Sequence, residues 1–386
     1  MVIIMKSRIE ALYIHIPFCD HICVYCDFYK MIAKEEEKEK YIKYLIKELE
    51  LKKNLLNDIK TIYIGGGTPS HLNINLLKML FIELKKYINF NNLVEFTVEC
   101  NPIDINQDLV NLFKEFSINR ISLGVQSFNN QKLEYLKRNH SKEIAINAIK
   151  LLQENNIFNI NCDIIYGLEI IDLFKDNLSI IKEDLDILIE YNIPHISCYT
   201  LIVEDKSILN KFIKENKYKP LDDDVEADIY DFINKYLKQN KYFHYEISNY
   251  AKKGFESIHN LTYWNNQYYL GLGANASYYY DNIRYTNINK LKEYYQGIDN
   301  GKLNYLEEIK LEKKDQMDEE IILGLRKLNG VNKNNFFNKF NCDIIMTYKN
   351  TYDLVNKNIL IDDGEYIKVK EDKSYILNDI LLSILD

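Results

Sequence analysis

The strongest constraint on the fold is a regular alternation of short β-rich runs and longer helical patterns between Leu12 and about Leu201. Apolar runs such as LYIHI, TIYIGG and LVEFTVEC are separated by segments with helical periodicity, one of them from about Glu35 to Leu56. Such alternation is typical of βαβ units around a parallel sheet. We therefore predict an α/β protein with a barrel or partial barrel of six units, whose ligands gather at the C-terminal ends of the strands.

The pattern changes after Leu201 to a helix-rich stretch, an aromatic segment and a final run of helix, hairpin and helix. A chain of 386 residues is long enough for more than one domain. We predict three parts, which are a ligand-binding core over residues 1–250, an aromatic linker segment over 251–300 and a smaller α+β module over 301–386.

The overall charge and the apolar pattern exclude several classes of partner. The formal net charge is −8, which argues against nucleic acid because binding to nucleic acid depends on neutralising phosphates. The apolar stretch near the N-terminus is interrupted by Lys6 and Arg8 and is too short for a secretion signal or a membrane span. We expect a protein of the reducing cytoplasm.

Three of the seven cysteines crowd into one short segment directly after the first β-rich run. Three residues separate Cys19 from Cys23, and two separate Cys23 from Cys26. Thiolates are the usual ligands of iron–sulfur clusters, and three of them leave one iron of a 4Fe–4S cluster open. That iron can chelate the amino and carboxylate groups of S-adenosylmethionine, whose reductive cleavage gives a 5′-deoxyadenosyl radical. The alternatives are three unrelated thiols or a zinc site completed by His15 or His21, although a second pair of zinc ligands is not evident.

The segment YIHIPFCDHICVYCDF (13–28) resembles the radical SAM superfamily, in the branch of the oxygen-independent coproporphyrinogen III oxidases and the HemW heme chaperones. The resemblance extends over nearly the whole chain. It continues in GGGTPS, TVECNP, NRISLGVQSFN, LKRNH, CDIIYGL, HISCYTL, YEISNYA, LGLRKLNGV and LNDILLSIL. It implies a partial (β/α)6 barrel followed by a smaller C-terminal domain of the type found in these oxidases, with the cluster on Cys19, Cys23 and Cys26.

The glycine run after TIYI lets a ligand or a neighbouring backbone approach closely, although a bare tight turn would use the same residues. By resemblance, Gly66, Gly67 and Thr68 line the methionine end of S-adenosylmethionine. Tyr13 and Tyr25 flank the cofactor near the cluster by the same resemblance.

Four further polar residues fall at or near successive strand ends. Glu99 ends its predicted strand, where a carboxylate can accept hydrogen bonds from an ammonium group or from ribose hydroxyls. The resemblance implies that Gln126, Arg138 and Asp163 contact the nucleoside and the carboxylate of the cofactor, and an arginine can grip a carboxylate through paired donors. Taken singly, each of them would more often be a surface or packing residue, but together, at or near successive strand ends, they favour a binding site.

Two features separate a heme carrier from an enzyme. The decarboxylating oxidases carry another cysteine two residues after the third, where this chain has Phe28. The motif HNLTYW (259–264) matches one associated with heme binding in the chaperones, and a neutral His259 imidazole could ligate heme iron. A satisfied histidine beside core aromatics is the alternative reading of His259.

The resemblance therefore implies a heme-binding chaperone that delivers heme to hemoproteins, with membrane respiratory enzymes among the candidate recipients. The other hypothesis is oxidative decarboxylation of coproporphyrinogen III. Three positions depart from the family pattern. Asn275 replaces a common glycine, Ser277 stands where a histidine is common, and the segment EIIDLF (169–174) lacks the usual proline and polar turn.

Overall fold

A twelve-stranded sheet forms the centre of the computed structural model, which describes residues 8–169, 177–203, 207–215 and 219–385. The strand order is β14-β13-β12-β11-β1-β2-β3-β4-β5-β7-β10-β9. The strands of this sheet are β1 (Ala11–Ile16), β2 (Thr61–Gly66), β3 (Glu95–Cys100), β4 (Arg120–Gln126), β5 (Ile160–Tyr166), β7 (His195–Thr200), β9 (Phe243–Glu246), β10 (Asn249–Ala251), β11 (Tyr269–Leu272), β12 (Ser277–Tyr280), β13 (Ile283–Asn287) and β14 (Tyr305–Lys310).

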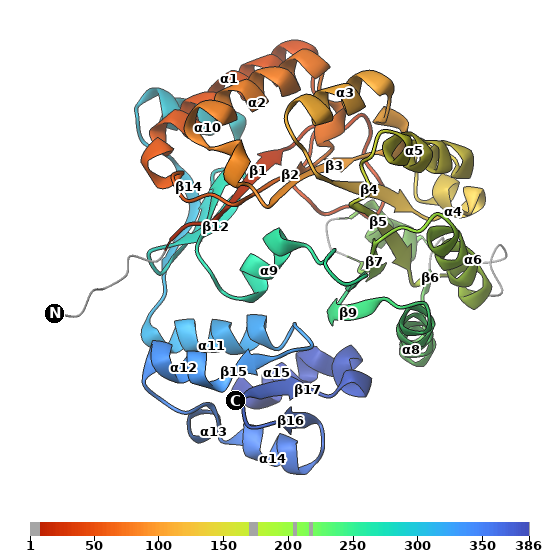
Figure 1. Cartoon of the computed structure of the whole chain (residues 1–386), viewed down its shortest axis with the longest axis vertical. Coiled ribbons are helices and arrows are strands. Elements are labelled where there is room, and N and C mark those ends of the chain that lie inside the picture. The colour runs from red at the N-terminus through yellow and green to blue at the C-terminus, as the bar shows by residue number, and fades with distance from the viewer. Residues whose placement is uncertain (1–7, 170–176, 204–206, 216–218, 386) are drawn as a thin grey trace.

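The six strands from β1 to β7 of this order are parallel, and helices cover one face of the sheet (Figure 1). These helices are α1 (Glu35–Leu51), α2 (Ile74–Tyr87), α3 (Gln107–Glu115), α4 (Asn130–Tyr135), α5 (Lys142–Glu154), α6 (Asn177–Glu190) and α8 (Asp223–Gln239). A short pair, β6 (Leu168–Glu169) and β8 (Lys219–Pro220), and helix α7 (Ile208–Lys214) lie beside them. These parallel strands and their covering helices agree with the predicted partial barrel.

The alternation of side chains along each strand explains why this barrel can hold a ligand. In β2, Ile62 and Ile64 are fully buried against the helices, whereas Thr61 and Tyr63 point to the opposite, inner face. The inner face is polar, so the barrel interior is lined by hydrogen-bonding groups instead of a second apolar core.

Side-chain caps mark the starts of several of these helices. Asn73, Asn106 and Ser141 each accept a hydrogen bond from a backbone N–H in the first turn of α2, α3 and α5. Such caps satisfy donors that have no partner inside the helix.

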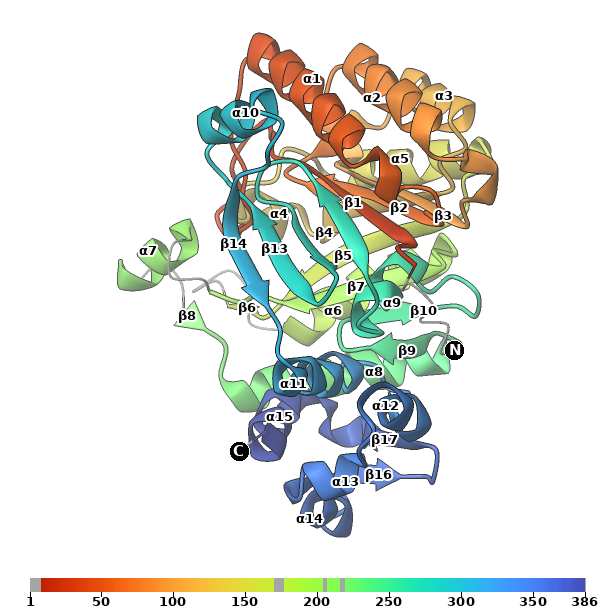
Figure 2. The ribbon, with the colours of Figure 1, turned by 90° about the vertical axis from the view of Figure 1, so that its left-hand side faces the viewer.

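The segment 251–300 is part of the main sheet, which corrects the expectation of a linker. Strand β11 pairs in parallel with β1, and β12, β13 and β14 extend the sheet by antiparallel pairing (Figure 2). Helices α9 (Ile258–Trp264) and α10 (Leu291–Asp299) belong to this region. Leu270 and Leu272 are fully buried, and the buried Lys52, directly after α1, donates to the Gly271 carbonyl at 2.8 Å. This packing makes β11 a structural member of the barrel.

The C-terminal module has a hydrophobic core of its own, which begins at Met317. Its elements are α11 (Lys313–Gly324), β15 (Val331–Asn332), α12 (Lys333–Phe340), α13 (Ile344–Thr347), α14 (Asn350–Asn356), β16 (Leu360–Asp362), β17 (Tyr366–Val369) and α15 (Leu377–Leu385). Because β14 pairs with β13, the module starts after Lys310 and not at residue 301. None of the helices in the described ranges is both long and apolar enough to cross a membrane.

Candidate functional site

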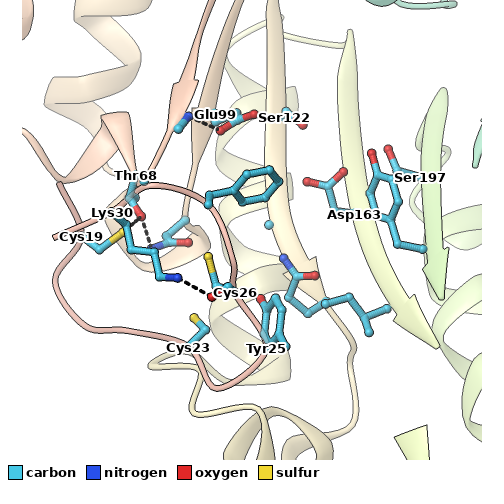
Figure 3. A pocket seen from close by; sticks show the side chains of 18 of the residues that line it. Cys19, Cys23, Tyr25, Cys26, Lys30, Thr68, Glu99, Ser122, Asp163 and Ser197 are labelled. Atoms are coloured by element: carbon cyan, nitrogen blue, oxygen red, sulfur yellow. Dashed lines mark hydrogen bonds between the residues drawn. The ribbon is translucent and has the colours of Figure 1, made fainter. Parts of the chain in front are cut away.

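A cavity of about 480 Å³ lies at the C-terminal ends of the parallel strands and extends into the barrel (Figure 3). Every predicted site residue except Tyr13 and His259 lines it. These lining residues are Cys19, Cys23, Tyr25, Cys26, Gly66, Gly67, Thr68, Glu99, Gln126, Arg138 and Asp163. The volume is within the range of ordinary small-molecule sites.

The loop after β1 holds the three cysteines against this cavity. Its two ends are joined by backbone hydrogen bonds, from the Cys19 N–H to the Met31 carbonyl at 3.0 Å and from the Met31 N–H to the Pro17 carbonyl at 2.7 Å. Figure 3 shows the three thiols on one side of the cavity, facing Asp163 and Ser197 on strands across it. The loop therefore presents its thiols to one shared space.

Donors point at two of the sulfurs. The Thr68 hydroxyl donates to Cys19 Sγ at 3.6 Å, and Arg138 Nη1 donates to Cys23 Sγ at 3.4 Å. Burial opposes ionisation of the Cys23 thiol, but His21 and Arg138 outweigh it and lower its pKa to about 7. Burial raises the pKa of Cys19 to about 11. N–H and O–H groups aimed at sulfur are the usual outer contacts of metal-bound thiolates.

The donor set fits an iron–sulfur cluster better than a single zinc ion. Within the described ranges, no group of three or more His, Cys, Asp or Glu side chains could hold one metal ion. A polynuclear cluster takes each thiolate on a separate iron, so its ligands need not converge on one point. Both ring nitrogens of His15 are already engaged, with the Tyr13 hydroxyl at 2.9 Å and the Tyr29 carbonyl at 3.0 Å.

The glycine run brings the end of β2 against the cysteine loop. Gly66 has a φ of +122°, and a Cβ there would lie 2.7 Å from the ring of His15. A Cβ on Gly67 would lie 2.8 Å from the Phe18 carbonyl oxygen and 2.9 Å from Cys19 Sγ. Contacts this short exclude a larger side chain. Glycine is therefore required at both positions because the end of β2 lies directly against the cysteine loop, and it also leaves space for a ligand.

Two buried carboxyl groups lie on the inner face of the barrel. Glu99 accepts hydrogen bonds from the Tyr63 hydroxyl at 2.7 Å and from the Gly66 N–H at 3.0 Å, and burial raises its pKa to about 7. Asp163 accepts from Asn161 Nδ2 at 2.8 Å, and burial raises its pKa above the usual range. Both groups can accept hydrogen bonds from hydroxyl or ammonium groups of a ligand.

Arg138 and Gln126 lie at the C-terminal end of β4. Arg138 Nη2 donates to Asn101 Oδ1 at 2.6 Å and to the Gly124 carbonyl at 2.8 Å. Gln126 adopts a left-handed backbone with a φ of +67°, next to an irregularity in the pairing of β4 with β5. Strained backbone of this kind clusters at ligand sites.

His259 lies away from the cavity, at the N-terminal end of β2. It is fully buried; its Nδ1 is 2.8 Å from Thr61 Oγ1 and its Nε2 is 2.6 Å from the Tyr263 hydroxyl. Burial lowers its pKa to about 3. Both ring nitrogens of His259 are therefore engaged in hydrogen bonds, as expected for a buried structural histidine. A ligand of heme iron needs one ring nitrogen free. Heme ligation by His259 stays a prediction, and it requires one of these two hydrogen bonds to break.

Tyr13 also lies outside the cavity. Its hydroxyl is hydrogen-bonded to Nδ1 of His15, and its ring centroid is 6.2 Å from that of Tyr63.

Several lining residues were not predicted from the sequence. They are Arg120, Ser122, Asn161, Ser197, Tyr199 and Asn260. Most of them alternate with period two along β4, β5 and β7, which is the signal that could have identified them.

The radical SAM superfamily model matches residues 13–173. The chain is 36% identical to the heme chaperone HemW of Lactococcus lactis over 97% of each chain. It is 34% identical to the heme chaperone HemW of Bacillus subtilis over 86% of this chain and 87% of that one. The solved structure of coproporphyrinogen III oxidase (HemN) from Escherichia coli overlays with a TM-score of 0.83, at 20% identity, over 98% of this chain and 90% of that one, a likeness of fold.

Proposed function

The chain belongs to the HemW heme chaperone family of the radical SAM superfamily, and on that premise we propose that it is a heme-binding chaperone. The observation that carries the proposal is Phe28, which lines the mouth of the cavity with 71% of its surface exposed. The family's decarboxylating oxidases carry a cysteine at this position. An exposed phenylalanine there offers an apolar surface for a macrocycle beside an otherwise complete cysteine site.

The cluster and S-adenosylmethionine belong to the proposal as resident cofactors. Cys19, Cys23 and Cys26 would hold the cluster. Gly66, Gly67 and Thr68, with Glu99, Gln126, Arg138 and Asp163, would hold S-adenosylmethionine. When bound, the pair supplies one-electron chemistry at the sulfonium group. Arg138 would bind the cofactor's carboxylate, and the buried carboxyl groups of Glu99 and Asp163 would accept hydrogen bonds from its hydroxyl and ammonium groups.

We further propose that the protein works in the cytoplasm and passes heme to recipient hemoproteins, membrane respiratory enzymes among them. Support for this step comes from the relatives named heme chaperones and from thiols that need a reducing compartment.

Two paired assays distinguish a heme-binding chaperone from a coproporphyrinogen III oxidase. Heme titration of the anaerobically reconstituted protein, followed by visible absorption, is expected to give saturable binding. Anaerobic incubation with a reductant, S-adenosylmethionine and coproporphyrinogen III is expected to give no protoporphyrinogen. Absence of heme binding together with formation of protoporphyrinogen would replace the proposal with the oxidase function.

A variant pair tests His259 separately. His259→Ala removes the imidazole, whereas Thr61→Val removes only its hydrogen-bond partner. If His259 ligates the iron, only the first substitution changes the spectrum of the heme complex. If both leave the spectrum unchanged, His259 is not the ligand, and the chaperone proposal then stands on the binding measurement.

A further inference from the structure

Asp163 rests on a buried pair of polar side chains from β5 and β7. Asn161 lies two residues before Asp163 on β5, and His195, the first residue of β7, pairs with Asn161 across the two parallel strands. Asn161 and His195 have exposed fractions of 3% and 0%. Asp163 and Asn161 line the cavity, and His195 reaches this lining through its contact with Asn161. His195 is therefore placed to act on the site through another residue.

The side-chain amide of Asn161 is fully used in one orientation. Its Nδ2 donates to Asp163 Oδ1 at 2.8 Å and to the Ser122 hydroxyl at 2.8 Å. Its Oδ1 accepts from the Ser197 hydroxyl at 3.1 Å and lies 2.6 Å from His195 Nδ1. A reversed amide would turn its oxygen toward the Asp163 carboxyl group and its NH2 group toward the His195 ring. The contacts at Oδ1 therefore hold an N–H donor of the amide on Asp163.

The tautomer of His195 follows from its two partners. Because an amide oxygen can only accept, Nδ1 carries the proton and donates to Asn161. The other nitrogen, Nε2, then accepts from the Tyr245 hydroxyl at 2.8 Å, and this hydroxyl accepts from the Ser257 N–H at 3.3 Å. Burial keeps the pKa of His195 well below its ordinary value, so the ring is neutral, as this pattern requires. The hydrogen bonds thus run in one direction, from the start of α9 to Asp163.

We propose that His195 is a positioning residue for S-adenosylmethionine, which holds the Asn161 amide in the orientation that fixes the Asp163 carboxyl group in the cavity. This inference rests on the proposed cofactor site and adds to it a residue that supports a ligand-binding side chain from behind. A carboxyl group held by a fixed donor keeps one orientation, so less freedom is lost when a ligand binds to it. Supporting hydrogen bonds of this kind keep a binding side chain within the narrow geometry that a ligand needs.

Two substitutions at position 195 separate the Nδ1 donor from the rest of the imidazole. Asparagine places its amide nitrogen near the position of Nδ1, whereas glutamine places its amide near Nε2. Binding of S-adenosylmethionine to the cluster-loaded protein is measured by anaerobic equilibrium dialysis without a reductant. We expect His195→Gln to bind about tenfold more weakly than the wild type, and His195→Asn to stay within about twofold of it. His244→Gln, at a partly buried histidine of β9, is the matched control and should bind as the wild type does.

A double-mutant cycle separates positioning from general damage to the fold. If His195 acts through Asp163, its loss should matter little once the carboxyl group is gone. We expect the tenfold effect of His195→Gln to shrink to about twofold or less in the Asp163→Asn background. Equal effects in both backgrounds would overturn the proposal, as would an Asp163→Asn variant with the affinity of the wild type. If Asp163→Asn binds too weakly for the cycle, the comparison of His195→Gln with His195→Asn decides by itself.

The outcomes also separate this inference from the proposed cofactor site. A cluster-loaded wild type that does not bind S-adenosylmethionine overturns the cofactor site itself. A wild type that binds, while His195→Gln and His195→Asn are equally weak or equally unimpaired, overturns only the role of His195. If the variants at position 195 do not fold, Tyr245→Phe takes their place, because it removes the hydroxyl that donates to Nε2. We expect this variant to bind about threefold more weakly, and an unchanged affinity would overturn the proposal.

Discussion

The two ends of the barrel are built in opposite ways. At the cysteine end, the backbone takes left-handed conformations at Gly66, Gln126 and Asn275, and polar side chains face an open cavity. At the other end, α9 lies between the sheet and the C-terminal module (Figure 1). There, the first residues of β2 and β3, Thr61 and Glu95, bond to the first turn of α9.

At the α9 end, the donors at the start of the helix bond to a buried carboxylate of the barrel. Glu95 is buried and accepts from the Ile258 N–H at 2.7 Å, from the Ser257 hydroxyl at 3.2 Å and from the His259 N–H at 3.3 Å. A carboxylate at a helix start satisfies donors that the helix leaves free. The α9 end is therefore closed by bonds within the chain, while the cysteine end opens on a cavity lined by polar side chains.

The largest effect is expected from removing one cysteine of the cluster loop. Cys23→Ala should abolish the cluster, because a three-ligand site has no spare thiolate. Iron and sulfide analysis after anaerobic reconstitution should give about four of each in the wild type and close to none in the variant. Cys342→Ala, in the C-terminal module, is the control and should keep the full content. A full cluster in Cys23→Ala would contradict the site.

Loss of the Glu95 carboxylate should be the most damaging single change at the α9 end. Glu95→Ala leaves several buried donors without an acceptor and should lower the free energy of unfolding by about 3 kcal/mol. Urea denaturation under anaerobic conditions measures this, with the exposed Glu36→Ala as a control expected to change little. Equal stability of the two variants would show that α9 is not held by this contact.

The pH dependence of the free energy of unfolding tests whether His259 is buried as a neutral imidazole. Burial in the folded protein lowers the pKa of His259 to about 3 from its ordinary value of 6.5, so between these pH values the unfolded chain binds a proton that the folded protein does not. The contribution of His259 is therefore complete above pH 6.5 and is lost as the pH falls toward 3. The stability difference between wild type and His259→Gln should shrink by about 1.4 kcal/mol per pH unit below 6.5. A difference that stays constant from pH 7 to pH 5 would contradict the buried neutral imidazole.

Much of this fold could be predicted from the sequence, because β-rich runs and helical periodicity are local signals. The predicted helix from about Glu35 to Leu56 corresponds to α1, which ends at Leu51. Strand β11 is not predicted, because a run of four residues (Tyr269–Leu272) is too short to show strand periodicity, and only its pairing with β1 makes it part of the barrel.

Site residues that belong to a sequence motif could be predicted. Residues whose role depends on contacts between distant parts of the chain could not. The cysteine spacing and the glycine run gave residues that now line one cavity. The role of His259 depends on Thr61, 198 positions away, so the motif alone left ligand and satisfied histidine both open. The burial of Arg120 near Glu99 and Asp163 depends on the packing of separate strands, which a sequence does not show. Residues 170–174 of the EIIDLF segment lie outside the described residues, and Ser277 is an exposed residue whose hydroxyl is 3.0 Å from that of Thr286.

The smallest predicted effect concerns Asn275, which stands where relatives commonly have glycine. It has a φ of +62° between the fully buried Ala274 and Ala276, so the turn needs a left-handed residue at this point. Asparagine tolerates that conformation better than other residues with a side chain, which explains the replacement. Asn275→Gly should leave the free energy of unfolding within about 0.5 kcal/mol, whereas Asn275→Ala should lower it by about 1 kcal/mol. Asn300→Ala, at a position with a φ of −85°, controls for loss of the amide. If glycine and alanine at position 275 prove equally stable, the backbone strain assigned to the cysteine end is absent from this turn.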